Sequence, residues 1–237
     1  MKILAFDSTA KAASVAVMDN ERLLGVYNVN NGLTQSELLL PMAESLLKSL
    51  KLDFSNIELL AASTGPGSFT GVRIGAALVK GIAFGKNIPC ASVSTLEALS
   101  ENLFPLVGII VPTMDARRGQ VYTATFRCDG KTITRLTPDR AISIEELANE
   151  LSEYNEDIYI CGDGYEVTKR GLDAKGVSYR ETPLLLLDEN AYSVAKVAYK
   201  KFLSGETVSD TELTATYLRL PQAERERLER INSEKKD

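Results

Sequence analysis

The chain has 237 residues, of which 44% are hydrophobic and 25% are charged, the balance of an ordinary globular protein rather than a disordered one. Its 27 basic and 32 acidic residues give a net charge of −5 without a basic cluster, so this chain alone should bind nucleic acid poorly. It contains no histidine, which excludes hydrolysis with a histidine base and histidine-ligated zinc or iron.

The cysteines and the apolar runs of the sequence indicate the cellular compartment of the protein. Cys90, Cys128 and Cys161 are odd in number and widely spaced in apolar surroundings, which indicates reduced structural thiols rather than a disulfide framework. The apolar run at residues 3–6 is too short for a signal peptide and ends at Asp7, and no stretch is long enough to span a membrane. We therefore expect a cytoplasmic protein with room for two lobes.

The chain begins with three short strands and a helix. Residues 2–6, 13–18 and 23–29 are apolar runs separated by short turns, and they predict an antiparallel start to a sheet. Thr34 and Glu37 then have the spacing of a capping box, in which each side chain satisfies a free amide at a helix start. The pattern predicts a helix that continues to about residue 50.

This first helix carries more apolar residues than a single buried stripe requires. We therefore expect part of its surface, including Leu40 and Leu47, to contact something besides the core of its own chain. Pro41 lies within the apolar run, so the helix should either kink there or begin its regular part nearby.

A glycine-rich turn starts at Gly65, after a strand predicted at residues 57–63. Gly65 and Gly67 allow the backbone to turn through positive φ, and Ser68 can cap the helix that follows. Such a turn aims backbone amides at one point, which is a phosphate-binding geometry. Because neither the P-loop nor the dinucleotide fingerprint is present, we favour a purely structural turn.

The second helix has a face of small residues. Gly71, Gly75, Leu78 and Ile82 recur at spacings of three and four, so they share one side of the helix. A bare backbone allows another helix to approach closely, and packing within the chain and docking of a partner both remain open. Arg73 favours docking. A cation in the first helical turn opposes the helix dipole, so we expect this residue to pair with an anionic group on a partner.

The rest of the chain repeats this order in shortened form. Strands are predicted at residues 89–93, 107–115, 120–127, 132–136 and 158–161, and helices begin after Ser94 and Ser143 and near residue 190. The repeat predicts two related lobes with a cleft between them, at residues 1–103 and, reduced in size, at residues 104–220. Residues 221–237 are a charged tail to which we assign no function.

Taken together, these elements resemble the TsaB (YeaZ) family of the actin-like ATPase (ASKHA) superfamily. The resemblance implies an α/β fold of two ribonuclease-H-like lobes, each a mixed sheet with flanking helices. The residues that carry it are 5–9, Glu37 with 39–41, 65–75, 93–98, 115–122 and 217–219. Gln35 departs from the family pattern, in which many members have histidine at this position.

The resemblance also implies a function and a set of partners. It implies a noncatalytic subunit that binds and activates the TsaD transferase, with the TsaE ATPase, in the synthesis of threonylcarbamoyladenosine beside the tRNA anticodon. ATP or ADP and the metal would be held by the partner subunits, and tRNA would be bound only through the complex. The patch that binds TsaD would give a homodimer when it is used symmetrically.

Two sets of residues follow as candidate sites. The expected partner interface consists of Leu40, Leu47, Gly71, Arg73, Gly75, Leu78 and Ile82. The positions at which kinases of this fold hold a metal nucleotide correspond to Asp7, Ser8, Thr9, Gly65, Gly67, Ser68 and Asp115. We favour vestigial, turn-capping roles for this second set. The alternative is an independent ATP-dependent phosphotransferase, supported by these same residues and by Gly162-Asp163-Gly164 and weakened by the short second lobe.

Overall fold

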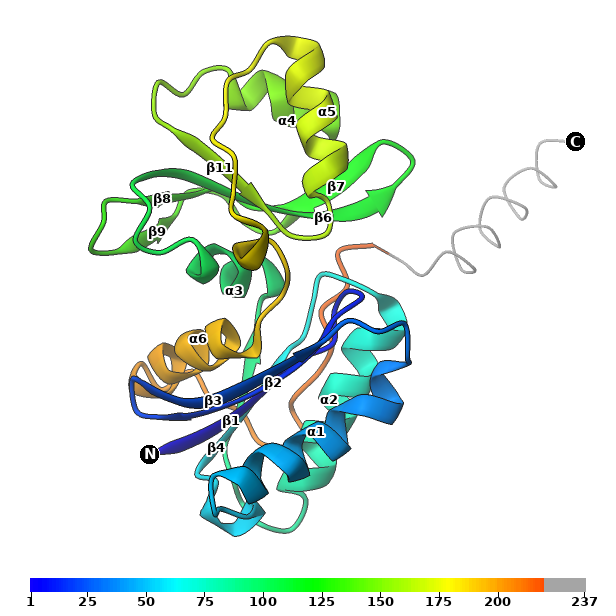
Figure 1. The fold of residues 1–237 in the computed structure, drawn as a ribbon, viewed down its shortest axis with the longest axis vertical. Helices are drawn as coiled ribbons and strands as arrows, with labels where there is room; N and C mark the ends of the chain where they lie inside the picture. Colours follow the sequence, from blue (N-terminus) through cyan, green and yellow to red (C-terminus); the bar gives the residue numbers. More distant parts are fainter. Residues whose placement is uncertain (220–237) are drawn as a thin grey trace, which may run out of the picture.

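The N-terminal strand forms the centre of the first of two sheets in the computed structural model, which describes residues 1–219 (Figure 1). The strand order is β3-β2-β1-β4-β5, with β1 (Lys2–Asp7), β2 (Ala13–Asp19), β3 (Arg22–Val29), β4 (Leu59–Ser63) and β5 (Cys90–Val93). The first three strands pair antiparallel, as predicted, and β4 and β5 add to β1 in parallel. Almost every residue of β1, β2 and β4 is buried, because helices cover both faces of this sheet.

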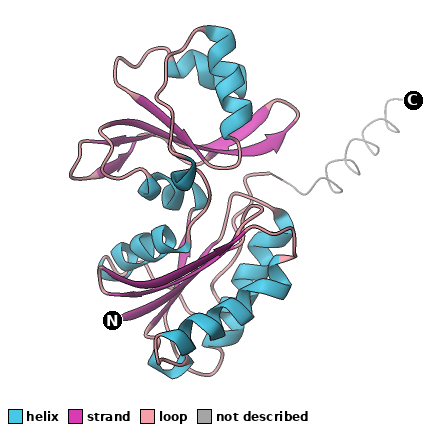
Figure 2. Cartoon of the chain, in the orientation of Figure 1, coloured by secondary structure: helices cyan, strands magenta, loops and turns pink. Residues whose placement is uncertain are grey.

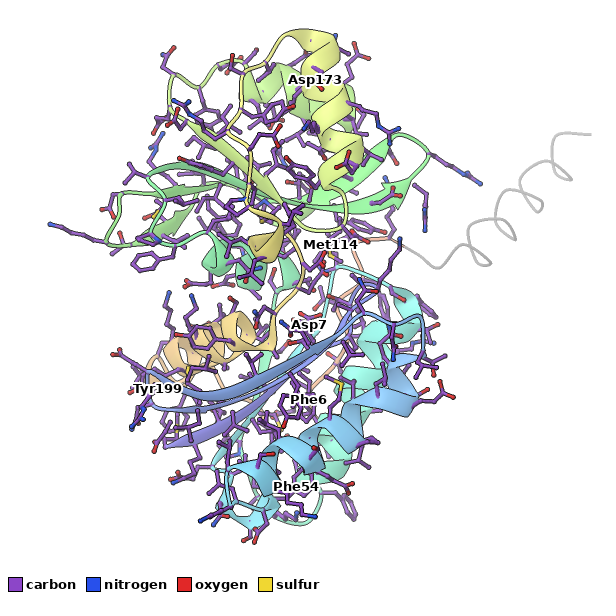
Figure 3. The ribbon with its side chains drawn as sticks, viewed as in Figure 1. Phe6, Asp7, Phe54, Met114, Asp173 and Tyr199 are labelled. Carbon is purple, nitrogen blue, oxygen red and sulfur yellow. The ribbon has the colours of Figure 1, made fainter. Side chains whose placement is uncertain are left out.

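Two helices cover one face of the first sheet, α1 (Gln35–Ser49) and α2 (Phe69–Ala83) (Figure 1). Their inner faces form one apolar core with alternate residues of β1, β2 and β4. Phe6 points from β1 into this core (Figure 3). Thr34 and Glu37 form the predicted capping box, in which the Glu37 carboxylate accepts from the Thr34 amide at 3.1 Å, and the same carboxylate also accepts from the Thr34 hydroxyl at 2.7 Å. Pro41 lies inside α1 rather than at its start.

The second sheet is organised around one long strand. Its members are β6 (Gly108–Arg117), β7 (Gln120–Thr123), β8 (Phe126–Cys128), β9 (Ile133–Arg135), β10 (Arg140–Ser143) and β11 (Ile158–Cys161). β7 and β8 pair antiparallel with β6 in one register from Gly108 to Asp115, with a shift between Asp115 and Arg117, so the strand predicted at residues 120–127 exists with one interruption. The interruption lies opposite Pro112, which has no N–H to donate to a sheet. β11 pairs parallel with the other edge of β6.

Helices lie between the two sheets and beyond them (Figure 2). α4 (Ile144–Leu151) and α5 (Tyr165–Lys175) cover the outer face of the second sheet, and the Ser143 and Glu146 side chains form the predicted capping box of α4. α3 (Thr95–Asn102) and α6 (Ala191–Leu203) pack on each other between the sheets. The short 3-10 helices η1 (Phe54–Asn56) and η2 (Leu184–Leu186) lie in the connections.

The packing of the two middle helices does not follow the expected lobe boundaries. α3, predicted as part of residues 1–103, buries Leu96, Leu99 and Leu103 against the second sheet. α6, predicted as part of residues 104–220, packs Val194 and Val197 against the first sheet. The chain therefore crosses between the lobes at α3 and again at α6, and at each of these two places a helix packs on the sheet of the other segment. The tail expected at residues 221–237 lies outside the described residues.

Both lobes share the same core order of three antiparallel strands, a helix, a parallel strand and a second helix, when β7 with β8 and β9 with β10 are each counted as one interrupted strand. This is the ribonuclease-H-like, actin-like ATPase architecture that the sequence predicted, with the second sheet reduced. Cys90, Cys128 and Cys161 are all free and buried. Burial raises the pKa of Cys90 to about 11, which keeps its thiol protonated and unreactive near neutral pH. Within the described residues, no helix is both long and apolar enough to cross a bilayer.

Candidate functional site

The carboxylate at the end of β1 is used inside the fold. Asp7 is buried, and its Oδ1 accepts hydrogen bonds from the amide and the hydroxyl of Thr9 at 2.9 and 2.7 Å. Its Oδ2 accepts a hydrogen bond from the Ser63 hydroxyl on β4. Burial raises the pKa of Asp7, while the hydrogen bonds from Ser63 and Thr9 oppose that rise. Both oxygens of this carboxylate are thus engaged in shaping the turn between β1 and β2.

That turn packs directly on the glycine-rich turn. The Ser68 amide donates to the Thr9 carbonyl at 2.7 Å, and the Ser8 hydroxyl donates to the Gly71 carbonyl at 2.8 Å. A Cβ at Gly67 would lie 2.5 Å from the Thr9 carbonyl oxygen, and a Cβ at Gly71 only 1.9 Å from the Ser8 carbonyl oxygen. The glycines are needed for this close backbone approach. These contacts give the turn a structural role.

Gly71 and Gly75 consequently do not face a partner. A Cβ at Gly75 would lie 2.7 Å from the Ser8 hydroxyl oxygen, so both glycines point toward the β1–β2 turn. The expected interface is wrong for two further residues, because Leu47 is 2% exposed and Ile82 is 9% exposed in the first core. A helix that is apolar on most sides does not reveal from its spacing which stripe is buried.

Another stripe of α2 and the outer side of α1 remain at the surface. Leu40 is 39% exposed, and Leu78 is only partly buried against the core. Besides Phe69 at its start, α2 exposes Thr70, Arg73, Ala77, Gly81 and, directly after the helix, Phe84. These positions recur at spacings of three and four, which places them on one side of the helix. We call these five residues, together with Leu40 of α1, the outer helix face.

Gly81 is the most informative position of the outer helix face. A Cβ at this residue would meet no atom within 4 Å, so nothing in the described chain requires glycine there. Glycine inside an exposed helix costs about 0.5–1 kcal/mol relative to alanine. Ala77 is exposed one turn earlier, and Phe84 is 78% exposed just beyond the helix. The sequence also has small residues four positions apart at 77 and 81, but the sequence analysis selected the pair of glycines at 71 and 75 instead.

The Arg73 guanidinium makes a cation–π contact and a hydrogen bond within its own chain. Its guanidinium lies 3.7 Å from the centre of the Phe69 ring, and its Nε donates to the Tyr217 hydroxyl at 2.7 Å. The Phe69 and Tyr217 rings also pack on each other, with centroids 5.1 Å apart. In the part of the chain that the structure describes, no carboxylate forms an ion pair with Arg73. The anion expected on a partner therefore stays a prediction, and within residues 1–219 the guanidinium contacts two aromatic rings and a phenol oxygen.

Tyr217 belongs to a segment that crosses the cleft between the lobes. The Thr216 amide donates to the Thr64 carbonyl at 2.7 Å, which fixes the segment to the first lobe. Arg219 reaches the second lobe, where it donates to the Ala116 carbonyl at 3.4 Å and to the Gln120 side chain. The cleft beneath it has a volume of about 490 Å³. Figure 3 shows Asp7 and Met114 on the sides of the two sheets that face this region.

Two carboxylates of the second lobe, those of Asp115 and Asp163, lie beside this cleft. Asp115 accepts hydrogen bonds from the Arg117 amide at 2.8 Å and the Arg117 guanidinium at 3.1 Å. Asp163 accepts from the Asp115 amide at 3.0 Å, and burial raises its pKa. Asp115 thus stabilises the β6–β7 turn much as Asp7 stabilises the β1–β2 turn. Residues 1–219 contain no group of three acidic or cysteine side chains arranged to hold a metal ion.

Glu189 is a buried carboxyl that the sequence analysis did not single out. It precedes α6, where the chain crosses back to the first lobe, and its Oε1 has no hydrogen-bond partner in the described chain. Burial raises its pKa well above the usual value, and the nearby charges of Asp7 and Asp163 raise it further. Only the tertiary structure brings these three acidic residues together.

The geometry thus defines a two-lobed protein of the actin-like ATPase fold whose end-of-strand aspartates cap turns and whose first lobe exposes an outer helix face. A family model described as "TsaD: tRNA N6-adenosine threonylcarbamoyltransferase" matches residues 33–214. The chain is 30% identical over 225 residues to the tRNA threonylcarbamoyladenosine biosynthesis protein TsaB of Escherichia coli, covering 92% of this chain and 95% of that protein. The TsaB protein of Bacillus subtilis is 30% identical over 173 residues, or 73% of this chain and 76% of that one.

The solved structures include a protein of the same shape. YeaZ from Pseudomonas aeruginosa superimposes with a TM-score of 0.76 at 25% sequence identity, over 92% of this chain and 99% of that chain. The chain belongs to the TsaB (YeaZ) family, within the broader family that the TsaD model describes.

Proposed function

We propose that this chain is a noncatalytic subunit of the complex that forms threonylcarbamoyladenosine in tRNA, and that it binds and activates a TsaD-like transferase. The full-length relatives named as biosynthesis proteins for this nucleoside support the pathway. A TsaE-like ATPase completes the assembly, and tRNA is held through the complex rather than by this acidic chain. The proposal places the protein in the cytoplasm with these partners.

The outer helix face is the observation that carries this proposal. Ala77 and Gly81 leave the backbone of α2 accessible, Phe84 exposes an apolar side chain just beyond the helix, and Leu40 exposes another on α1. Small residues at a spacing of four allow a second helix to pack closely, and the flanking apolar side chains supply the buried area. A helix of the TsaD-like subunit is the proposed occupant. In its absence, the same face of a second copy would form a symmetric homodimer.

The environment of the aspartates supports a role without chemistry in this chain. Both oxygens of Asp7 accept hydrogen bonds from its own lobe, and Asp115 is paired with Arg117. A group that acts in catalysis must reach the reacting atoms, and Asp7 is buried beneath the turn that it caps. We therefore assign the nucleotide, the metal and the transfer step to the partner subunits.

A pair of matched substitutions tests the interface. Ala77 lies on the outer helix face, and Ala174 is an equally exposed alanine near the end of α5 in the second lobe. Ala77→Glu should weaken binding of the TsaD-like subunit at least about ten-fold, because it places an unpaired carboxylate between two helices. Ala174→Glu should leave the affinity unchanged. Isothermal titration calorimetry with the purified subunit from the same organism measures both affinities.

Activity provides the second readout. In a reconstituted reaction with the transferase, the ATPase, tRNA and the threonylcarbamoyl donor, loss of product should follow loss of complex in the Ala77→Glu protein and should be reversed by raising its concentration. Equal binding by Ala77→Glu and the unsubstituted protein would place the partner on another face. ATP turnover by this chain alone would instead support the phosphotransferase alternative.

A further inference from the structure

A second cavity lies between the lobes at α6, away from the residues that line the cleft described above. Its volume is about 550 Å³, and it is lined by α6, the β2–β3 turn, the connection after α3 and the turn between β8 and β9. Figure 1 shows α6 and the β8–β9 hairpin on the same side of the molecule, and Figure 3 labels Tyr199 on that helix. Both lobes therefore contribute side chains to this one cavity, which the proposed function does not use.

The cavity contains more positive charge than its one buried carboxylate balances. Glu101 is 8% exposed, and it pairs with Lys196 at 3.1 Å and with Lys200 at 2.5 Å. Lys131, on the opposite wall, is exposed and forms no ion pair within residues 1–219. Glu21 is the other carboxylate of the lining, and it is exposed at the rim. The lining thus carries three lysines and two carboxylates, of which only Glu101 is buried, in a chain whose net charge is −5.

Burial is costly for Lys196, the one lysine of the three whose side chain is mostly removed from water. Loss of water around the Lys196 ammonium lowers its pKa, and the neighbouring charge of Lys200 lowers it again, while Glu101 acts in the opposite direction. Its Nζ also donates to the Glu101 carbonyl at 2.9 Å. A bound anion near these groups would stabilise the charged lysines, and a phosphate is well suited because lysine binds it as a compact point charge.

Aromatic rings form the other part of the lining. Tyr192 and Tyr199 are partly buried on α6, and Phe104 is 42% exposed in the connection between the lobes. Neither tyrosine hydroxyl has a hydrogen-bond partner within the described chain. The Lys196 ammonium lies 5.3 Å from the centre of the Tyr192 ring, so Tyr199 and Phe104 are the rings left for stacking. Planar bases stack on aromatic rings with about 1–3 kcal/mol per base in nucleic-acid complexes.

We propose that this cavity binds a nucleoside monophosphate, with the phosphate at the lysines and the base against the aromatic rings. The volume admits a molecule of this size. Because its walls come from both lobes, the bound nucleotide would contact α6 on one side and the β8–β9 turn on the other. This site is separate from Asp7, Asp115 and the glycine-rich turn, so it does not depend on the nucleotide positions of actin-like kinases.

The experiment measures binding of adenosine 5′-monophosphate to the full chain by isothermal titration calorimetry. Adenosine lacks the phosphate and ribose 5-phosphate lacks the base, so each should bind at least about ten-fold more weakly than the complete nucleotide. Lys131→Glu should weaken nucleotide binding at least about five-fold, since it replaces an attraction with a repulsion. Phe104→Ala should weaken it through loss of stacking.

Lys11→Glu is the matched control, because Lys11 is an exposed lysine that lines the cleft on the far side of the lobe junction. It makes the same change in charge, and it should leave the affinity unchanged. Circular dichroism of each variant verifies the fold. The proposal is overturned by the absence of binding at millimolar nucleotide, by loss of binding in Lys11→Glu alone, or by equal losses in the two charge variants.

Discussion

Replacing two glycines of the same helix by alanine should change stability in opposite directions. In α2, Gly71 is packed against the β1–β2 turn, whereas Gly81 is open to solvent. Alanine at either position gains about 0.5–1 kcal/mol from the reduced entropy of the unfolded chain and better helix propensity. At Gly81 nothing opposes this gain, so Gly81→Ala should stabilise the protein by about that amount.

At Gly71 the steric cost exceeds the gain. The new Cβ would lie 1.9 Å from the Ser8 carbonyl oxygen, which is a backbone atom that cannot rotate away. Movement of the turn would strain the hydrogen bonds from Ser8 to the Gly71 carbonyl and from the Ser68 amide to Thr9. Overpacking costs about 1–3 kcal/mol and each buried hydrogen bond about 1 kcal/mol. We therefore expect Gly71→Ala to destabilise the protein by about 2–4 kcal/mol.

Urea unfolding followed by far-ultraviolet circular dichroism, with a reductant for the three thiols, measures both changes from the transition midpoints. A Gly71→Ala protein as stable as the original would refute the close approach of the two turns. A Gly81→Ala protein that loses stability to the same extent would show that both glycines face the interior. Either result would also remove the physical basis for separating the buried stripe of α2 from its outer helix face.

Two further predictions concern buried carboxyl groups. Asp7→Asn should lower the free energy of unfolding by about 1–2 kcal/mol, because an amide cannot replace every hydrogen bond that the carboxylate accepts, yet it should keep most activity in the reconstituted tRNA reaction. A hundred-fold fall in turnover with the complex intact would contradict the noncatalytic proposal. Glu189→Gln should raise stability at pH 7 and have little effect below pH 4. The folded-state pKa of Glu189 is raised, so the folded protein binds the proton more tightly, and stability falls as pH rises from the unfolded pKa through the folded one. Thermal melting from pH 4 to pH 8 measures this, and equal pH dependence of the two proteins would show that Glu189 is not the group responsible.

Local sequence signals predicted most of the elements, because their causes lie within a few residues. The capping boxes at Thr34 and Ser143 involve a side chain and an amide three positions apart, and both are present. The strand predicted at residues 120–127 is present along β6 as β7 and β8, and its interruption is explained by Pro112. The repeated order of strands and helices also determined the two-lobed fold class.

The direction in which each side chain points depended on contacts between distant segments. The spacing of Gly71 and Gly75 indicated a close approach, but that approach is to Ser8, more than sixty residues earlier, rather than to a partner. Arg73 meets Tyr217 from the opposite end of the chain. α3 packs on the second sheet and α6 on the first, because each helix buries its apolar face on the sheet beside it in space. The order of elements along the chain does not specify which sheet that is. The sequence by itself thus determined the elements and their repeat, whereas only the tertiary structure decided which faces are buried and which remain free to bind.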